Sequence, residues 1–137
     1  MRLLCVEDKA TLCKMIELML AVTGIDLEFT SDRQGAVEAY QLAEFDALLI
    51  DMDLPDKAGL KAAHDIRQME DGFHLGYTPI LFLGGHPRDE DIAWAFESGG
   101  DGHLVKPFTS EALIGALDRV LRTPNQPGLT SLLRLAR

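Results

Sequence analysis

Short apolar runs alternate along the chain with longer amphipathic segments. Four runs contain almost no polar residues, and they cover residues 3–6, 47–50, 80–83 and 104–105. Runs of this length are typical of strands that are buried on both faces of a sheet. A fifth segment, residues 26–30, alternates polar and apolar positions and is typical of a half-buried edge strand. The pattern therefore predicts five strands.

A segment with helical spacing follows each predicted strand. In the first, Leu12, Met15, Ile16, Met19 and Leu20 follow the i, i+3, i+4, i+7, i+8 spacing, and Gly24 is a plausible stop signal. The other four are marked by Val37 and Tyr40; by Leu60, Ala63 and Ile66; by Ile92 and Phe96, ending near Gly99 and Gly100; and by Leu113, Ile114, Leu117, Val120 and Leu121. Candidate N-caps are Ser31 or Asp32 for the second helix and Thr109 or Ser110 for the fifth.

Regular alternation of strands and helices predicts the α/β fold class. Successive strand–helix pairs form right-handed crossovers, which produce a parallel sheet with helices on both faces. We expect residues 1–122 to form this single domain. Residues 123–128 contain two prolines and a glycine, so we expect residues 123–137 to form a linker or tail outside the domain, with a short amphipathic segment that begins at Leu129.

Composition narrows the classes of function. The net charge is −9, which repels phosphate backbones and anionic lipids, so we expect no direct nucleic-acid or membrane partner. No stretch approaches the roughly 20 apolar residues that a membrane-spanning helix needs. Cys5 and Cys13 lack the spacing of a zinc site or a disulfide framework, and we interpret them as plain thiols in a reducing compartment. These features favour a cytoplasmic protein.

Polar side chains follow the predicted strands at the points where they end. Glu7 and Asp8 come after the first strand, Asp51 and Asp53 after the third, and Lys106 after the fifth. The fourth strand runs into Gly84 and Gly85, which have no side chains to fill the space. Because the carboxyl ends of parallel strands meet at one edge of the sheet, we expect these groups to converge there.

Converging carboxylates indicate a cation site. Two carboxylates about 4 Å apart repel each other by about 4 kcal/mol at an effective dielectric constant of 20, and a divalent cation removes that repulsion. Oxygen ligands select Mg²⁺, Mn²⁺ or Ca²⁺ over zinc. The same arrangement suggests that Asp51 attacks a phosphoryl group while the cation and Lys106 neutralise the charge. Pro107 rigidifies the turn after Lys106, through a trans bond by default or through a cis bond.

Together these motifs make residues 1–122 resemble the response-regulator receiver domains of two-component signalling. The resemblance rests on the acid pair Glu7-Asp8, on Leu-Leu-Ile-Asp-Met-Asp-Leu-Pro at residues 48–55 followed by Gly59, on Thr-Pro-Ile at residues 78–80, and on Leu-Val-Lys-Pro-Phe at residues 104–108. It implies a flavodoxin-like sheet of five parallel strands in the order 2-1-3-4-5.

The resemblance also implies roles for individual residues. Asp51 would be phosphorylated by a phosphohistidine on a sensor histidine kinase or phosphotransfer protein. Mg²⁺ would be bound directly by Asp8 and Asp51, through water by Glu7, and by the backbone carbonyl of Asp53, while Lys106 would pair with the phosphoryl group. A downstream protein or a second copy of the chain would dock on the face formed by the fourth helix, fifth strand and fifth helix.

Three positions depart from the family pattern. Gly84 stands where the family has Ser or Thr, His103 stands where it has Tyr or Phe, and Asp53 places a negative charge two residues after the phosphoacceptor. We therefore expect a receiver whose conformational switch is altered or weakened. Gly85, His86 and Pro107 are expected at the edge of the pocket, and Trp94 is expected to be partly exposed near the docking face.

Two other functions remain open. The pattern Asp51-x-Asp53 after a strand also resembles the first motif of the haloacid-dehalogenase-type phosphatases, in which the first Asp attacks phosphate and the second is the general acid/base. A binding module that keeps the acidic pocket without phosphotransfer is the other alternative. The leading hypothesis is a stand-alone receiver, which is not an enzyme in the usual sense although it catalyses its own phosphorylation and dephosphorylation.

Overall fold

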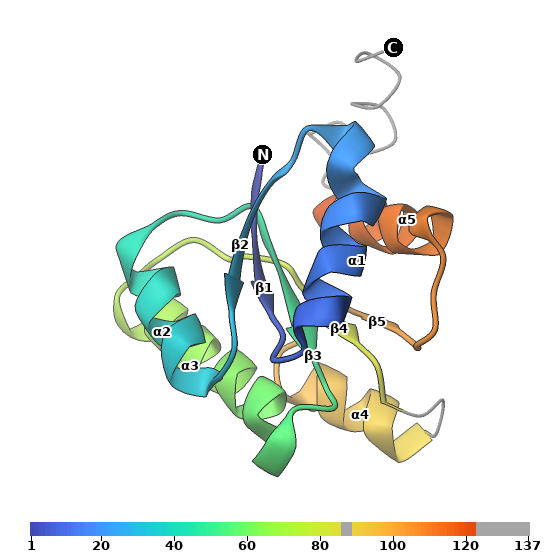
Figure 1. Cartoon of the computed structure of the whole chain (residues 1–137). Coiled ribbons are helices and arrows are strands. Elements are labelled where there is room, and N and C mark those ends of the chain that lie inside the picture. The colour runs from blue at the N-terminus through green and yellow to red at the C-terminus, as the bar shows by residue number, and fades with distance from the viewer. Residues whose placement is uncertain (86–88, 123–137) are drawn as a thin grey trace.

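The computed structural model, which describes residues 1–85 and 89–122, contains one five-stranded parallel sheet (Figure 1). Its strands lie in the order β2-β1-β3-β4-β5, which confirms the order implied by the family resemblance. The strands are β1 (Arg2–Val6), β2 (Asp26–Thr30), β3 (Ala47–Asp51), β4 (Ile80–Leu83) and β5 (Gly102–Leu104). The central strand β3 is buried along its whole length, as its apolar sequence predicts.

The described residues also form five α-helices and two short 3₁₀ segments, of which all but the last helix lie between strands. They are α1 (Ala10–Leu20), η1 (Ala21–Thr23), α2 (Arg33–Leu42), η2 (Pro55–Lys57), α3 (Ala58–Gly72), α4 (Asp89–Glu97) and α5 (Ser110–Leu121). The Asp32 side chain caps α2 by accepting a hydrogen bond from the Gly35 N–H, and the Thr109 hydroxyl caps α5 by accepting one from the Ala112 N–H. Both caps are among the predicted candidates. The described helices include none that is long and apolar enough to cross a membrane.

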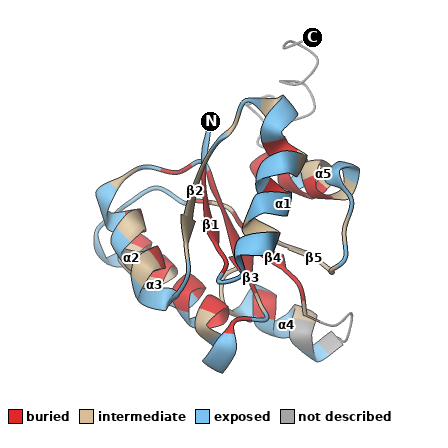
Figure 2. Ribbon diagram, in the orientation of Figure 1, coloured by how far each residue is buried: buried red, intermediate tan, exposed pale blue. Residues whose placement is uncertain are grey.

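The sheet is covered on both faces by helices, and each face has its own apolar core (Figures 1 and 2). Successive residues of a strand point to opposite faces. On β1, Leu4 and Val6 belong to the core that includes residues of α2, α3 and α4, whereas Leu3 and Cys5 belong to the core that includes residues of α1 and α5. Cys5 and Cys13 are free thiols, and burial raises the pKa of Cys5 well above its usual value.

Two predicted elements differ from the structure. The fifth strand is Gly102–Leu104 rather than residues 104–105, because its backbone pairs with β4 from Leu81↔Gly102 onward although Gly102 and His103 are not apolar. Among the α4 residues whose burial is described, Ala95 is the buried one, whereas Phe96 is 50% exposed. This helix ends at Glu97, before the glycines. Short elements carry too few apolar positions to define their own boundaries.

Candidate functional site

Three carboxylates converge at the carboxyl edge of the sheet. Asp51 is the last residue of β3, and Glu7 and Asp8 directly follow the neighbouring strand β1. One oxygen from each carboxylate lies within 4.8 Å of the others. Glu7 and Asp51 are buried, while Asp8 is exposed at the mouth of the cluster. The structure therefore brings together three of the four acids that the sequence analysis singled out, and the fourth, Asp53, lies beside them.

The ammonium group of Lys106 lies among carboxylates. Its Nζ is 2.9 Å from Asp51 Oδ1, 3.5 Å from Asp53 Oδ2 and 3.8 Å from Glu7 Oε2. Burial disfavours the charge of Lys106, but the hydrogen bond to Asp51 and the charges of the three carboxylates outweigh burial, so the pKa of Lys106 is raised. Lys106 therefore remains cationic and fixes the orientation of the Asp51 carboxylate.

The buried carboxylate oxygens are not all satisfied. Among the described residues, Glu7 Oε2 and Asp51 Oδ2 have no hydrogen-bond partner. Burial, followed by the neighbouring Asp51 carboxylate, raises the pKa of Glu7 to about 7. Unpartnered buried oxygens are costly, and a hard divalent cation is the ligand that suits a set of carboxylate oxygens. The donor set therefore fits Mg²⁺.

Asp53 belongs to a different part of the site. Its backbone N–H donates to Asp51 Oδ1 at 2.8 Å, while its side chain reaches the turn after β4, where Oδ1 accepts a hydrogen bond from the Gly85 N–H at 2.9 Å. Gly84 and Gly85 both have positive φ values, +91° and +74°. The Asp53 side chain therefore lies over the glycine turn rather than within the carboxylate cluster.

The remaining predicted positions lie around this cluster. The His103 ring nitrogen Nε2 is 2.7 Å from the Gly84 carbonyl oxygen. Pro107 follows Lys106 through a cis peptide bond, the less common of the two forms considered. At Gly59 in α3, a side-chain Cβ would lie well under 3.0 Å from the backbone oxygen of Asp51, so this position accepts only glycine while α3 packs so closely. His86 lies outside the described residues.

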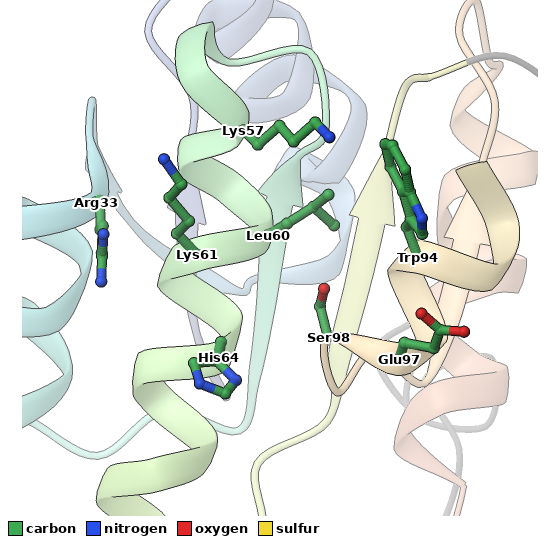
Figure 3. A pocket seen from close by; sticks show the side chains of 8 residues that line it. All are labelled: Arg33, Lys57, Leu60, Lys61, His64, Trp94, Glu97 and Ser98. Carbon is green, nitrogen blue, oxygen red and sulfur yellow. The ribbon is translucent and has the colours of Figure 1, made fainter. Parts of the chain in front are cut away.

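Sequence analysis missed a hollow of about 330 Å³ between α3 and α4 (Figure 3). Basic side chains contribute much of its lining, and the full set is Arg33, Lys57, Leu60, Lys61, His64, Trp94, Glu97 and Ser98. The Lys57 ammonium lies 3.7 Å from the centre of the Trp94 ring, which is 40% exposed as the sequence predicted. None of the strand-end acids lines this hollow, and no local spacing relates Lys57 to Trp94.

Comparison with known proteins identifies the family. The sequence model of one protein family, the response regulator receiver domain, matches residues 3–118 of this chain. The chain belongs to this family. Receiver domains are the phosphoacceptor switches of two-component signalling, and this match shows no enzyme family. The resemblance inferred from the sequence motifs is therefore confirmed.

Related proteins support the same assignment for this receiver domain. It is 32% identical over 121 residues to the transcriptional regulatory protein TrcR of Mycobacterium tuberculosis, covering 88% of this chain and 45% of the relative. It is 29% identical over 122 residues to the cell cycle transcriptional regulator CtrA of Caulobacter vibrioides, covering 89% and 51%. The receiver domain thus spans about half the length of these curated relatives.

Solved structures resemble this receiver domain over nearly their whole length. The chemotaxis response regulator CheY4 of Vibrio cholerae is 30% identical, with a TM-score of 0.77 and coverage of 88% of this chain and 98% of that chain. The receiver domain of the sensor histidine kinase PA1611 of Pseudomonas aeruginosa is also 30% identical, with a TM-score of 0.75 and coverage of 88% and 96%. The latter structure has a magnesium ion coordinated in its active site cleft.

Proposed function

We propose that this receiver domain accepts a phosphoryl group on Asp51 from a phosphohistidine of a sensor histidine kinase or phosphotransfer protein. The observation that carries the proposal is the state of the Asp51 carboxylate. Its Oδ1 is held by the Lys106 ammonium and by the Asp53 N–H, whereas its buried Oδ2 has no partner among the described residues. One oxygen is thus anchored, and the other is available as the nucleophile.

The transfer follows from this orientation. A lone pair of the Asp51 carboxylate attacks the phosphorus, and the bond between phosphorus and the donor imidazole nitrogen breaks. The imidazole keeps the electron pair of that bond and is protonated from solvent. Lys106, 2.9 Å from Asp51 Oδ1, holds the nucleophile in place and offsets the negative charge that arrives with the phosphoryl group.

The acidic cluster supplies the ligands of a magnesium ion in this proposal. Asp8 and Asp51 would bind the ion directly, Glu7 would act through water, and the backbone carbonyl of Asp53 would complete the protein ligands. The close approach of the three carboxylates and the unpartnered oxygen of Glu7 support this set. When bound, Mg²⁺ supplies positive charge that neutralises the phosphoryl oxygens.

The structure of the turn after β4 supports an altered read-out. Gly84 has no hydroxyl that could bind a phosphoryl oxygen, and its carbonyl is already hydrogen-bonded to His103. We therefore propose that the switch residues move less than in receivers that carry a hydroxyl residue and an aromatic residue at these positions.

The face of α4, β5 and α5 is the proposed docking surface for a downstream protein or a second copy. With a net charge of −9, direct nucleic-acid or membrane binding is not part of this proposal, and the proposed location is the cytoplasm.

Acetyl phosphate with Mg²⁺ tests the proposal directly. We expect the intact mass to increase by about 80 Da, the mass of one added phosphoryl group. Asp51→Asn should abolish this increase, whereas Asp26→Asn, a change at an exposed acid of β2, should retain it. Continuous release of phosphate from a phosphate ester would instead support an aspartyl phosphatase. An unchanged mass together with intact partner binding would support a binding module.

A further inference from the structure

Asp53 contacts an ammonium group and a backbone N–H, and both kinds of donor bind phosphoryl oxygens in proteins. Its Oδ2 lies 3.5 Å from the Lys106 ammonium, and its Oδ1 accepts the Gly85 N–H at 2.9 Å. The Asp53 side chain is 44% exposed, so it has room to rotate into solvent. The three acids that form the carboxylate cluster are Glu7, Asp8 and Asp51. The Asp53 carboxylate is not one of them, so binding a cation in that cluster does not explain where it lies.

Gly84 and Asp53 are sterically matched. A Cβ atom added at Gly84 would lie well under 3.0 Å from Asp53 Oδ2 and 3.1 Å from Lys106 Cε. The positive φ of Gly84, +91°, further disfavours any residue with a side chain. A serine or threonine hydroxyl at position 84 and the Asp53 carboxylate in its present place therefore exclude each other. Glycine at position 84 thus leaves the space that the Asp53 carboxylate occupies.

We propose that the Asp53 carboxylate is an internal competitor of the phosphoryl group, which occupies the Lys106 ammonium and the Gly85 N–H in the resting domain. This inference rests on the proposed phosphorylation of Asp51. A phosphoryl group adds a charge of about −1.5 to −2 at neutral pH. The described acids around Lys106 already include Asp51, Glu7 and Asp53, so the incoming charge displaces Asp53 from the two donors.

The competition has a defined consequence. In the resting domain, the glycine turn after β4 is already bonded to an anion, so phosphorylation exchanges one anion for another instead of introducing the first. Neutralising Asp53 removes a repulsion from the phosphorylated state. For two charges a few ångströms apart at a partly exposed site, we expect Asp53→Asn to raise the phosphorylated fraction about threefold to tenfold at subsaturating acetyl phosphate.

A matched charge change separates this effect from net charge. Asp56 is an exposed acid in η2 with a positive φ of 57°, which asparagine tolerates. Asp56→Asn removes the same charge three positions from Asp53 and should leave the phosphorylated fraction within a factor of about 1.5 of the wild-type value, because solvent and salt screen an exposed charge. Equal phosphorylated fractions in wild type, Asp53→Asn and Asp56→Asn would overturn the competitor role while leaving Asp51 phosphorylation intact.

A double-mutant cycle tests the contact without any phosphorylation. Gly84→Ala should lower the midpoint of urea unfolding, because the new methyl group meets both the Asp53 carboxylate and the strained backbone angle. In the Asp53→Ala background the carboxylate is gone and only the backbone strain and the Lys106 contact remain, so the shift caused by Gly84→Ala should fall to about half. Identical shifts in the two backgrounds would overturn the steric match.

The two experiments also distinguish this inference from the proposed function. If neither the wild type nor any variant gains mass, phosphorylation of Asp51 fails, and with it the competitor role. If all variants gain mass equally and the double-mutant cycle is additive, the competitor role alone fails. A raised phosphorylated fraction in Asp53→Asn together with non-additive shifts supports both.

Discussion

The His103 ring nitrogen Nε2 lies 2.7 Å from the carbonyl oxygen of Gly84, so two of the residues that depart from the expected family pattern are hydrogen-bonded to each other. A carbonyl oxygen only accepts hydrogen bonds, so Nε2 carries the proton and donates. The bond joins β5 to the turn after β4, beside the backbone bond from the Gly84 N–H to the Leu104 carbonyl. Gly84, which follows β4, is therefore hydrogen-bonded to β5 through both its N–H and its carbonyl group.

Replacing His103 with phenylalanine keeps an aromatic ring but removes the donor. We expect the free energy of unfolding to fall by about 1 kcal/mol, the usual contribution of one hydrogen bond. Urea unfolding at neutral pH measures this change. His103→Gln, which retains an N–H donor, should recover part of the loss, and His64→Gln on the exposed surface of α3 should have no effect. A His103→Phe variant as stable as the wild type would show that the bond contributes nothing.

Magnesium should stabilise the folded domain. A ligand that binds only the folded state, at ten times its dissociation constant, adds about 1.4 kcal/mol. For a domain of this size we expect the melting temperature to rise by about 3–6 °C. Thermal unfolding with and without millimolar Mg²⁺ measures the shift. Asp8→Asn should abolish this rise in melting temperature, while Asp26→Asn should retain it. A wild-type melting temperature that does not change with Mg²⁺ would contradict the metal site.

Gly59→Ala should disturb the phosphoacceptor strand. The added Cβ would lie well under 3.0 Å from the Asp51 carbonyl oxygen and 2.9 Å from Ile50 Cγ2, so α3 or β3 must shift. We expect a loss of about 2–3 kcal/mol in the free energy of unfolding and slower phosphorylation. Gly115→Ala in α5 is the matched control, because its nearest neighbour would be 3.6 Å away. This control should be neutral or more stable, since alanine is the better helix former.

The domain should lose stability at alkaline pH through Tyr40. Burial raises the pKa of Tyr40 to about 12, and its hydroxyl group bonds the Glu70 carboxylate at 2.7 Å. In the unfolded chain Tyr40 ionises near pH 10. The stabilisation that the folded environment of Tyr40 provides is therefore complete below pH 10 and is lost as the pH rises to about 12. Urea unfolding between pH 8 and about 12 should show this decline.

A control separates the two tyrosines that titrate in this range. Burial also raises the pKa of Tyr77 to about 12, and its hydroxyl donates to Asp101. Tyr77→Phe should therefore keep the part of the alkaline decline that belongs to Tyr40, and Tyr40→Phe should keep the part that belongs to Tyr77. If Tyr40→Phe leaves the decline unchanged, ionisation of Tyr40 is not its source.

Lys57, the last residue of η2, should connect the start of α3 to α4 through the Trp94 ring. The ammonium lies 3.7 Å from the ring centre, and such contacts contribute about 0.5–1 kcal/mol at exposed sites. Lys57→Met should lower the free energy of unfolding by that amount and change the fluorescence of Trp94, the single tryptophan of the chain. Lys61→Met, in the same hollow, has no ring contact among the described residues and should change neither quantity.

How far the sequence predicts the site differs from residue to residue. Asp51, Glu7 and Lys106 each follow an apolar run, and the rule that parallel strands end at one edge was sufficient to place them together. The pairing of His103 with Gly84 could not be predicted in this way, because it depends on the register between β4 and β5 and on a ring orientation. The boundaries of β5 were wrong for the same reason.

Asp53 illustrates the limit most clearly. Its charge and its position two residues after Asp51 are visible in the sequence, and they indicated a conflict with an arriving phosphoryl group. The sequence contains no sign that the side chain turns away from the acidic cluster to bond Gly85 and Lys106. That direction is decided by the open space above Gly84, which exists only after β3, β4 and the chain after β5 have come together.

Hydrophobic patterning by itself determined the fold class, the two-sided burial of the sheet and the edge at which the acids gather, because these follow from local periodicity and from the handedness of strand–helix crossovers. Tertiary structure alone decided which polar atoms touch. Hydrogen bonds and ion pairs between distant segments depend on tenths of an ångström in backbone placement, and the register of the strands and the packing of the helices against the sheet set those distances.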